Sequence, residues 1–126
     1  MARVLVVDDD DVVRGVVLAH LRRAGHWILE ATGGQDALEA TDGRTPPDIA
    51  VVDIGLPDMD GFALVSELRQ RPGFEDVGII FLSGRVGTGE IEAGRRLGAV
   101  YLTKPFIASA LLNAIDRLTT VTEASW

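Results

Sequence analysis

The chain of 126 residues is 47% apolar, a size and composition that predict one compact domain, residues 1–126, with its own hydrophobic core. Its net charge of −7, with no long basic run, argues against direct binding of nucleic acid or of an anionic membrane surface. The sequence lacks cysteine, which excludes disulfides and thiolate metal sites, and it has no run that matches a signal peptide or a membrane span. We therefore expect a cytoplasmic protein.

Short β-branched runs alternate with segments of helical periodicity along the whole chain. The predicted strands are RVLVVD (3–8), HWILEA (26–31), DIAVVD (48–53), VGIIFLS (77–83) and AVYLT (99–103). This alternation is typical of parallel α/β structure.

The segments between these strands predict amphipathic helices. Apolar residues of the first helix fall three or four positions apart, before a stop at Gly25: Val13, Val16, Val17, Leu21 and Ala24. A second, short helix is predicted at 34–40, and a third has Phe62, Val65 and Leu68 on its apolar face. The last helix carries one apolar stripe, Ile107, Leu111, Ile115 and Leu118. Residues 84–98 contain five glycines, so the fourth helix should be short.

Strands that are apolar on both faces need helices on both sides, which predicts a doubly wound α/β fold. Right-handed crossovers favour a single five-stranded parallel sheet, (βα)5 and flavodoxin-like, with strand order 2-1-3-4-5. In that order the strands at 3–8 and 48–53 are neighbours. Their carboxyl ends would meet at the switch point of the sheet, where ligands of such folds bind.

Carboxylates stand at both of these strand ends, Asp8 and Asp9 at the first and Asp53 at the other. Such a cluster destabilises the fold unless a cation compensates it. Oxygen ligands without histidine or cysteine favour Mg²⁺, which keeps several waters and can share positions with a phosphate. A carboxylate of Asp53 that attacked phosphorus would form an aspartyl phosphate. The neighbouring Asp10 and Asp11 are better explained as stabilisers of the following helix N-terminus.

The ends of the other two central strands offer groups that could bind a phosphoryl group. The strand at 77–83 ends in Ser83, followed by Gly84, and the strand at 99–103 is followed by Lys104. Taken alone, Ser83 could equally bond a nearby backbone group, and Lys104 could be a solvated surface residue.

Four motifs in order resemble the receiver domains of bacterial two-component response regulators. They are VLVVDDD (4–10), DIAVVDIGLPDMDG (48–61), LSG (82–84) and YLTKPF (101–106), and the resemblance covers essentially the whole chain. It implies that Asp53 accepts a phosphoryl group and that Asp8, Asp9, Asp53 and the carbonyl of Gly55 bind Mg²⁺.

The resemblance also implies roles for residues after the phosphoacceptor block. Ser83, Gly84 and Lys104 would engage the phosphoryl group, Ser83 and Tyr101 would switch conformation, and the Lys104–Pro105 bond would be cis. The chain departs from the usual family pattern at Gly55, Gly84 and Arg85, which are close to the expected phosphoryl group.

By this resemblance the chain would take its phosphoryl group from a histidine kinase or phosphotransfer protein. Its helix 4, strand 5 and helix 5 surface would then control a downstream protein or output domain, or form a phosphorylation-linked homodimer. Two alternatives are a haloacid-dehalogenase-like phosphatase and a phosphorylation-independent adaptor. The phosphatase would need further acids after the lysine, where only Asp116 and Glu123 remain. The acid, serine and lysine set argues against the adaptor.

Overall fold

A computed structural model describes residues 1–84, 92, 95, 96 and 98–124, with side chains described as far as residue 119. The elements are β1 (Arg3–Val7), α1 (Asp11–Arg23), β2 (Trp27–Ala31), α2 (Gly34–Thr41), β3 (Ile49–Asp53), α3 (Gly61–Arg69), β4 (Gly78–Ser83), β5 (Val100–Thr103) and α5 (Ala108–Ala124). Arg85 and most of the predicted fourth helix lie outside the described residues. Within the described part, no helix has the length and apolar character needed to span a bilayer.

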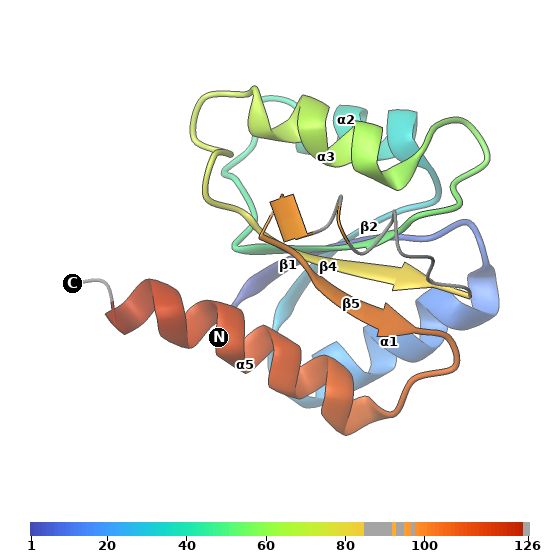
Figure 1. Cartoon of the computed structure of the whole chain (residues 1–126), viewed down its shortest axis with the longest axis vertical. Helices are drawn as coiled ribbons and strands as arrows, with labels where there is room; N and C mark the ends of the chain where they lie inside the picture. Colours follow the sequence, from blue (N-terminus) through green and yellow to red (C-terminus); the bar gives the residue numbers. More distant parts are fainter. Residues whose placement is uncertain (85–91, 93–94, 97, 125–126) are drawn as a thin grey trace.

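The five strands form one parallel sheet in the order β2-β1-β3-β4-β5, which confirms the predicted fold class. Helices α2 and α3 cover one face of the sheet, and α1 and α5 cover the other (Figure 1). β1 and β3 are neighbours, so the two acidic strand ends lie side by side.

Alternation of side chains along each strand divides the core into two layers. Val4 and Val6 of β1 pack in the layer that contains α1 and α5, whereas Leu5 and Val7 pack in the layer that contains α2 and α3. All four side chains are at most 1% exposed. Both faces of β1 are therefore buried, as the unbroken apolar run predicts.

The ends of α1 follow local signals in the sequence. Asp10 caps the helix by accepting hydrogen bonds from the N–H groups of Val12 and Val13, at 2.9 and 3.2 Å. The chain leaves the helix at Gly25, whose φ of 87° suits glycine. The predicted apolar face was wrong in part, because Val17, Leu18 and Leu21 are buried, whereas Val16 is 46% exposed.

The start of α5 also differs from the prediction. The helix begins at Ala108, and the carbonyl of Ile107 accepts the first hydrogen bonds, from Ala110 and Leu111. Ile107 thus stands before the helix, and its side chain is 69% exposed. Leu111 and Ile115 of the predicted stripe are wholly buried, and Leu118 is half-buried.

Candidate functional site

The first acidic strand end places one carboxylate inside the protein and one outside. Asp8 follows β1 and is 0% exposed, while Asp9 is exposed. Backbone hydrogen bonds hold the segment, because the Asp8 N–H donates to the carbonyl of Ala31 and Arg14 Nη1 donates to the carbonyl of Asp8 at 2.8 Å. Asp8 Oδ1 accepts from the N–H of Asp10 at 2.9 Å. The Asp8 carboxylate therefore has a fixed direction toward the neighbouring strand ends.

The second acidic strand end is the last residue of β3. Asp53 is 8% exposed, and its Oδ1 accepts a hydrogen bond from the N–H of Gly55 at 3.0 Å. The next residue continues the sheet contact, since the N–H of Ile54 donates to the carbonyl of Leu82 in β4. Asp53 is thus anchored by β4 on one side and by the start of the β3–α3 loop.

A single lysine links the two acids. Lys104 follows β5 and its N–H donates to the carbonyl of Ser83 at 2.7 Å, which places the residue at the same edge of the sheet. Its Nζ lies 3.0 Å from Asp8 Oδ2 and 3.1 Å from Asp53 Oδ2. The Lys104–Pro105 peptide bond is cis.

Burial and neighbouring charges shift the pKa values of Asp8 and Lys104. Desolvation raises the pKa of Asp8 above its ordinary value, and the nearby Asp53 charge adds to it, against the opposing effects of the Asp10 N–H and Lys104. Burial lowers the pKa of Lys104, but hydrogen bonds and charges from Asp8 and Asp53 outweigh it, so the net pKa is raised. The lysine is consequently charged at neutral pH, and the buried Asp8 carboxylate is energetically costly.

The acidic residues also match a site for a hard cation. One carboxylate oxygen from each of Asp8, Asp9 and Asp53 lies within 4.8 Å of the others. Three carboxylates with no nitrogen or sulfur donor suit Mg²⁺ rather than a transition metal. The residues present therefore fit the predicted metal.

The remaining predicted site residues lie on or near the same edge. Ser83 is the last residue of β4, next to Thr103 of β5, and it is 7% exposed. A Cβ added at Gly84 would meet no atom of the described residues within 4 Å. Tyr101 lies two residues before the end of β5, with its ring 5.5 Å from Phe81 and 6.4 Å from Phe62 between centroids. Tyr101 thus belongs to the core beneath α3 rather than to the acid–lysine cluster.

Comparison with known families gives the class of the protein. A family model described as the response regulator receiver domain matches residues 4–116. The chain belongs to this family. Receiver domains are phosphoacceptor signalling domains of two-component systems and act as switches, not as enzymes in the usual sense.

Relatives of this receiver domain occur in proteins of different lengths. It is 34% identical to the sensor histidine kinase CheAY of Helicobacter pylori, covering 90% of the chain but 14% of that protein. It is 35% identical to PilG of Pseudomonas aeruginosa, over 90% of the chain and 84% of the relative. It is 39% identical to the transcriptional regulatory protein PrrA of Mycobacterium tuberculosis, over 92% of the chain and 49% of the relative.

Solved structures agree with the receiver fold. Chemotaxis protein CheY4 of Vibrio cholerae superposes with a TM-score of 0.86 at 30% identity, over 94% of this chain and 98% of that one. A CheY-like receiver domain from Methanospirillum hungatei gives a TM-score of 0.88 at 26% identity, over 100% and 99%.

One contact of the receiver domain, between Asp58 and the first turn of α2, could not be predicted from its sequence motifs. Asp58, in the loop after Asp53, accepts hydrogen bonds from the N–H groups of Gly34 and Gln35, both at 2.9 Å. The hydrogen bond from Gln35 has the largest effect on the pKa of Asp58, followed by the bond from Gly34, and both lower it. Gly34 lies against Met59, and a side chain there would collide with it. The β3–α3 loop is therefore fastened to the first turn of α2.

A second close contact fixes the other end of that loop. Asp60 caps α3 by accepting from the N–H of Phe62 at 2.7 Å, and the N–H of Gly61 donates to the carbonyl of Ile54. A Cβ at Gly61 would lie 2.6 Å from the carbonyl oxygen of Asp53. Glycine is thus required where α3 begins beneath the candidate phosphoacceptor.

Proposed function

We propose that Asp53 is the phosphoacceptor of this receiver domain. The observation that supports it best is the position of Lys104 Nζ, which lies at hydrogen-bond distance from both Asp8 and Asp53. Buried acids that share one cation at a strand edge suit the binding of a dianionic phosphoryl group.

The reaction we propose is transfer from a phosphorylated histidine of a kinase or phosphotransfer protein. A carboxylate oxygen of Asp53 forms a bond to phosphorus as the bond between phosphorus and the donor's histidine nitrogen breaks. Asp8, Asp9, Asp53 and the main-chain carbonyl of Gly55 would hold Mg²⁺, which when bound would offset negative charge on the phosphoryl oxygens. Gly55 is exposed and has no side chain, so the approach of Mg²⁺ to its carbonyl would not be obstructed by one.

The other residues of the edge would bind the product. Lys104 Nζ would move from the Asp53 carboxylate to a phosphoryl oxygen, over a short path because it already lies 3.1 Å from Oδ2. The hydroxyl of Ser83 and the N–H of Gly84 would donate to another oxygen. These contacts would draw the end of β4 toward Asp53.

That local shift would be transmitted through Tyr101. Its ring packs against Phe81 of the same strand that ends in Ser83, so a movement of β4 changes the space available to it. We propose that this changes the surface near β5 and α5 that contacts a downstream protein, an output domain or a second phosphorylated copy. Sedimentation with and without beryllofluoride tests the last of these partners, and an unchanged mass contradicts it.

Labelling by acetyl phosphate in the presence of Mg²⁺ tests the phosphoacceptor directly. Asp53→Asn should abolish labelling, because the amide is a poor nucleophile. Asp10→Asn is the matched control, since asparagine caps helices as well as aspartate and the net charge changes by the same amount. Undiminished labelling of Asp53→Asn, with its circular dichroism spectrum unchanged, contradicts the proposal.

A further inference from the structure

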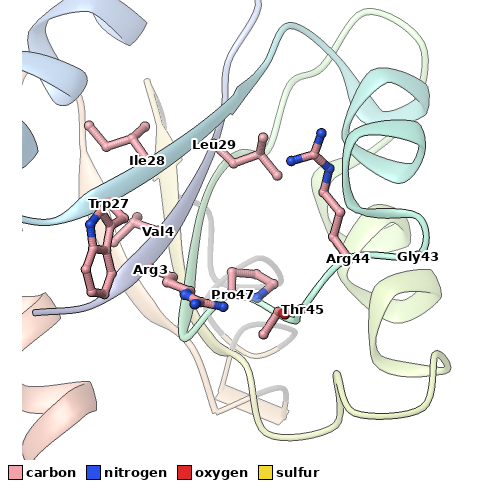
Figure 2. A pocket seen from close by; sticks show the side chains of 9 residues that line it. All are labelled: Arg3, Val4, Trp27, Ile28, Leu29, Gly43, Arg44, Thr45 and Pro47. Atoms are coloured by element: carbon pink, nitrogen blue, oxygen red, sulfur yellow. The ribbon is translucent and has the colours of Figure 1, made fainter.

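A groove lies at the end of the sheet opposite to Asp53. It has a volume of about 470 Å³ and lies at the amino ends of β1 and β2, between these two strands and the segment after α2 (Figure 2). We call this the β2 groove and define it by Arg3, Trp27, Leu29, Arg44, Thr45 and Pro47. It shares no residue with the candidate phosphoacceptor site, and its volume is in the range of small-ligand pockets.

The pairing of β1 with β2 builds one wall of the groove. Arg3 is paired with Trp27, and two residues further along Leu5 is paired with Leu29. Side-chain alternation therefore places Arg3, Trp27 and Leu29 on the face that α2 covers. β2 is the edge strand, so this wall has no further strand beside it.

The segment after α2 builds the opposite wall. Gly43 has a φ of 68°, a left-handed conformation that turns the chain at the end of the helix. The turn brings Arg44 and Thr45 beside the groove, and Pro47 continues the wall (Figure 2). The groove therefore lies between strands β1 and β2 on one side and the segment that follows α2 on the other.

The charges of the groove are unusual for this acidic chain. The guanidinium of Arg3 lies 5.8 Å from the centre of the Trp27 ring, and that tryptophan is 59% exposed. Among the residues that the structure describes, neither Arg3 nor Arg44 forms an ion pair. The carboxylate of Asp48 accepts a hydrogen bond from the backbone N–H of Arg3 at 2.8 Å, not from its guanidinium. Two guanidinium groups thus remain available in a protein of net charge −7.

We propose that the β2 groove binds a small aromatic anion. A flat ring would stack on the exposed face of Trp27, and its carboxylate or phosphate would bind the guanidinium groups of Arg3 and Arg44. Leu29 and Pro47 supply apolar contacts for the ring from the two walls. An aromatic carboxylate and a nucleoside monophosphate share this chemistry.

Nuclear magnetic resonance titration of the full chain in magnesium-free buffer tests the proposal, with AMP and benzoate as separate probes. Saturable shifts should appear at the Trp27 indole N–H and at the amides of Leu29, Gly43, Arg44 and Thr45. Tighter binding of AMP would identify the ligand as a nucleoside phosphate, and tighter binding of benzoate as an aromatic carboxylate. No saturation by either probe up to about 10 mM overturns the proposal.

Variants distinguish specific binding in the β2 groove from a general attraction of anions to exposed arginines. Arg44→Gln and Trp27→Ala should each weaken binding by about tenfold, equivalent to about 1.4 kcal/mol. Arg22→Gln, which removes an exposed arginine of α1 outside the groove, should leave the affinity unchanged. Equal affinity for inorganic phosphate and AMP, together with no effect of Trp27→Ala, overturns the proposal, because no ring would then be recognised.

Discussion

At the carboxyl ends of its strands the sheet gathers acids around one lysine, whereas at the amino ends of β1 and β2 it gathers two arginines beside a tryptophan. The acids are buried, with Asp8 at 0% and Asp53 at 8% exposure, and both contact Lys104. The arginines have no ion pair within the described residues, and Trp27 beside them is largely exposed.

The difference shows how burial decides what a charged group needs. A carboxylate inside the protein loses hydration and must find hydrogen bonds and an opposite charge in fixed positions. A guanidinium at an open groove remains hydrated and needs neither. The side chains at the carboxyl ends of the strands are therefore tightly constrained by their neighbours. Substitutions there should have larger effects than substitutions in the β2 groove.

The largest expected effect comes from the packing beneath the carboxyl end. Gly61→Ala would put a Cβ 2.6 Å from the carbonyl oxygen of Asp53, so β3 and α3 would have to separate. We expect a loss of about 2 kcal/mol in the free energy of unfolding, measured by urea denaturation, and weaker beryllofluoride binding.

Gly15→Ala is the matched control for that change. Gly15 lies within α1, and a Cβ there would meet no atom of the described residues within 4 Å. Alanine should stabilise the helix by up to about 1 kcal/mol and leave beryllofluoride binding unchanged. Equal stability of the two variants would show that the carboxyl end is less constrained than the comparison implies.

A second effect concerns the cost of burying Asp8. Its pKa is raised in the folded protein, so the folded state binds this proton more tightly than the unfolded chain does. The stability that protonated Asp8 contributes is fully present below its pKa in the unfolded chain. It is lost as the pH rises through its pKa in the folded protein. Asp8→Asn should therefore stabilise the metal-free protein at pH 7 and reduce this part of its pH dependence.

The same variant should behave oppositely toward metal. Removing one of three carboxylates should weaken Mg²⁺ binding by at least about tenfold, measured by calorimetry. Asp11→Asn offers a control, because Asp11 is exposed and pairs with Arg14 outside the cluster. An Asp8→Asn protein that lost stability at pH 7 in the absence of metal would contradict our account of the electrostatics.

The site at the carboxyl ends of the strands could be predicted from the sequence far better than the groove at their amino ends. Strands such as DIAVVD are apolar on both faces, so their positions and order follow from local pattern and the rules of parallel sheets. Asp53 and Lys104 stand next to strand ends, so their meeting at one edge follows from the strand order. Burial within helices was less certain, as Val16 and Ile107 illustrate, because it depends on how each helix is rotated and where it begins.

Contacts between segments distant in sequence could not be predicted in this way. The β2 groove needs the turn at Gly43 to bring Arg44 beside β2, and no local motif marks that approach. The bond from Gly34 to Asp58 likewise depends on α2 and α3 lying side by side on one face. LPDMDG reads as a loop in the sequence, and its role in holding α2 appears only in three dimensions.

The smallest expected effect concerns Asp58 in this loop. Its exposed carboxylate accepts hydrogen bonds from backbone N–H groups, whereas Asp8 and Asp53 are paired with Lys104. The pKa of Asp58 is lowered, so its contribution to stability is present above the unfolded pKa and is lost as the pH falls through the folded pKa. Asp58→Ala should be less stable than the unmodified protein at pH 7, by less than Gly61→Ala, and the difference should shrink in acid.

Two further variants give this prediction its control. Asp58→Asn keeps one acceptor oxygen for Gly34 or Gln35 and cannot ionise, so its stability should be intermediate at pH 7 without the acid-dependent change. Asp42→Ala removes an exposed acid at the other end of α2, where no described hydrogen bond involves the side chain. Urea midpoints measured across pH should therefore separate Asp58→Ala from Asp42→Ala. Identical pH profiles for these two variants would mean that the loop at the carboxyl end is held by its packing alone, with Met59 against Gly34 as the main contact.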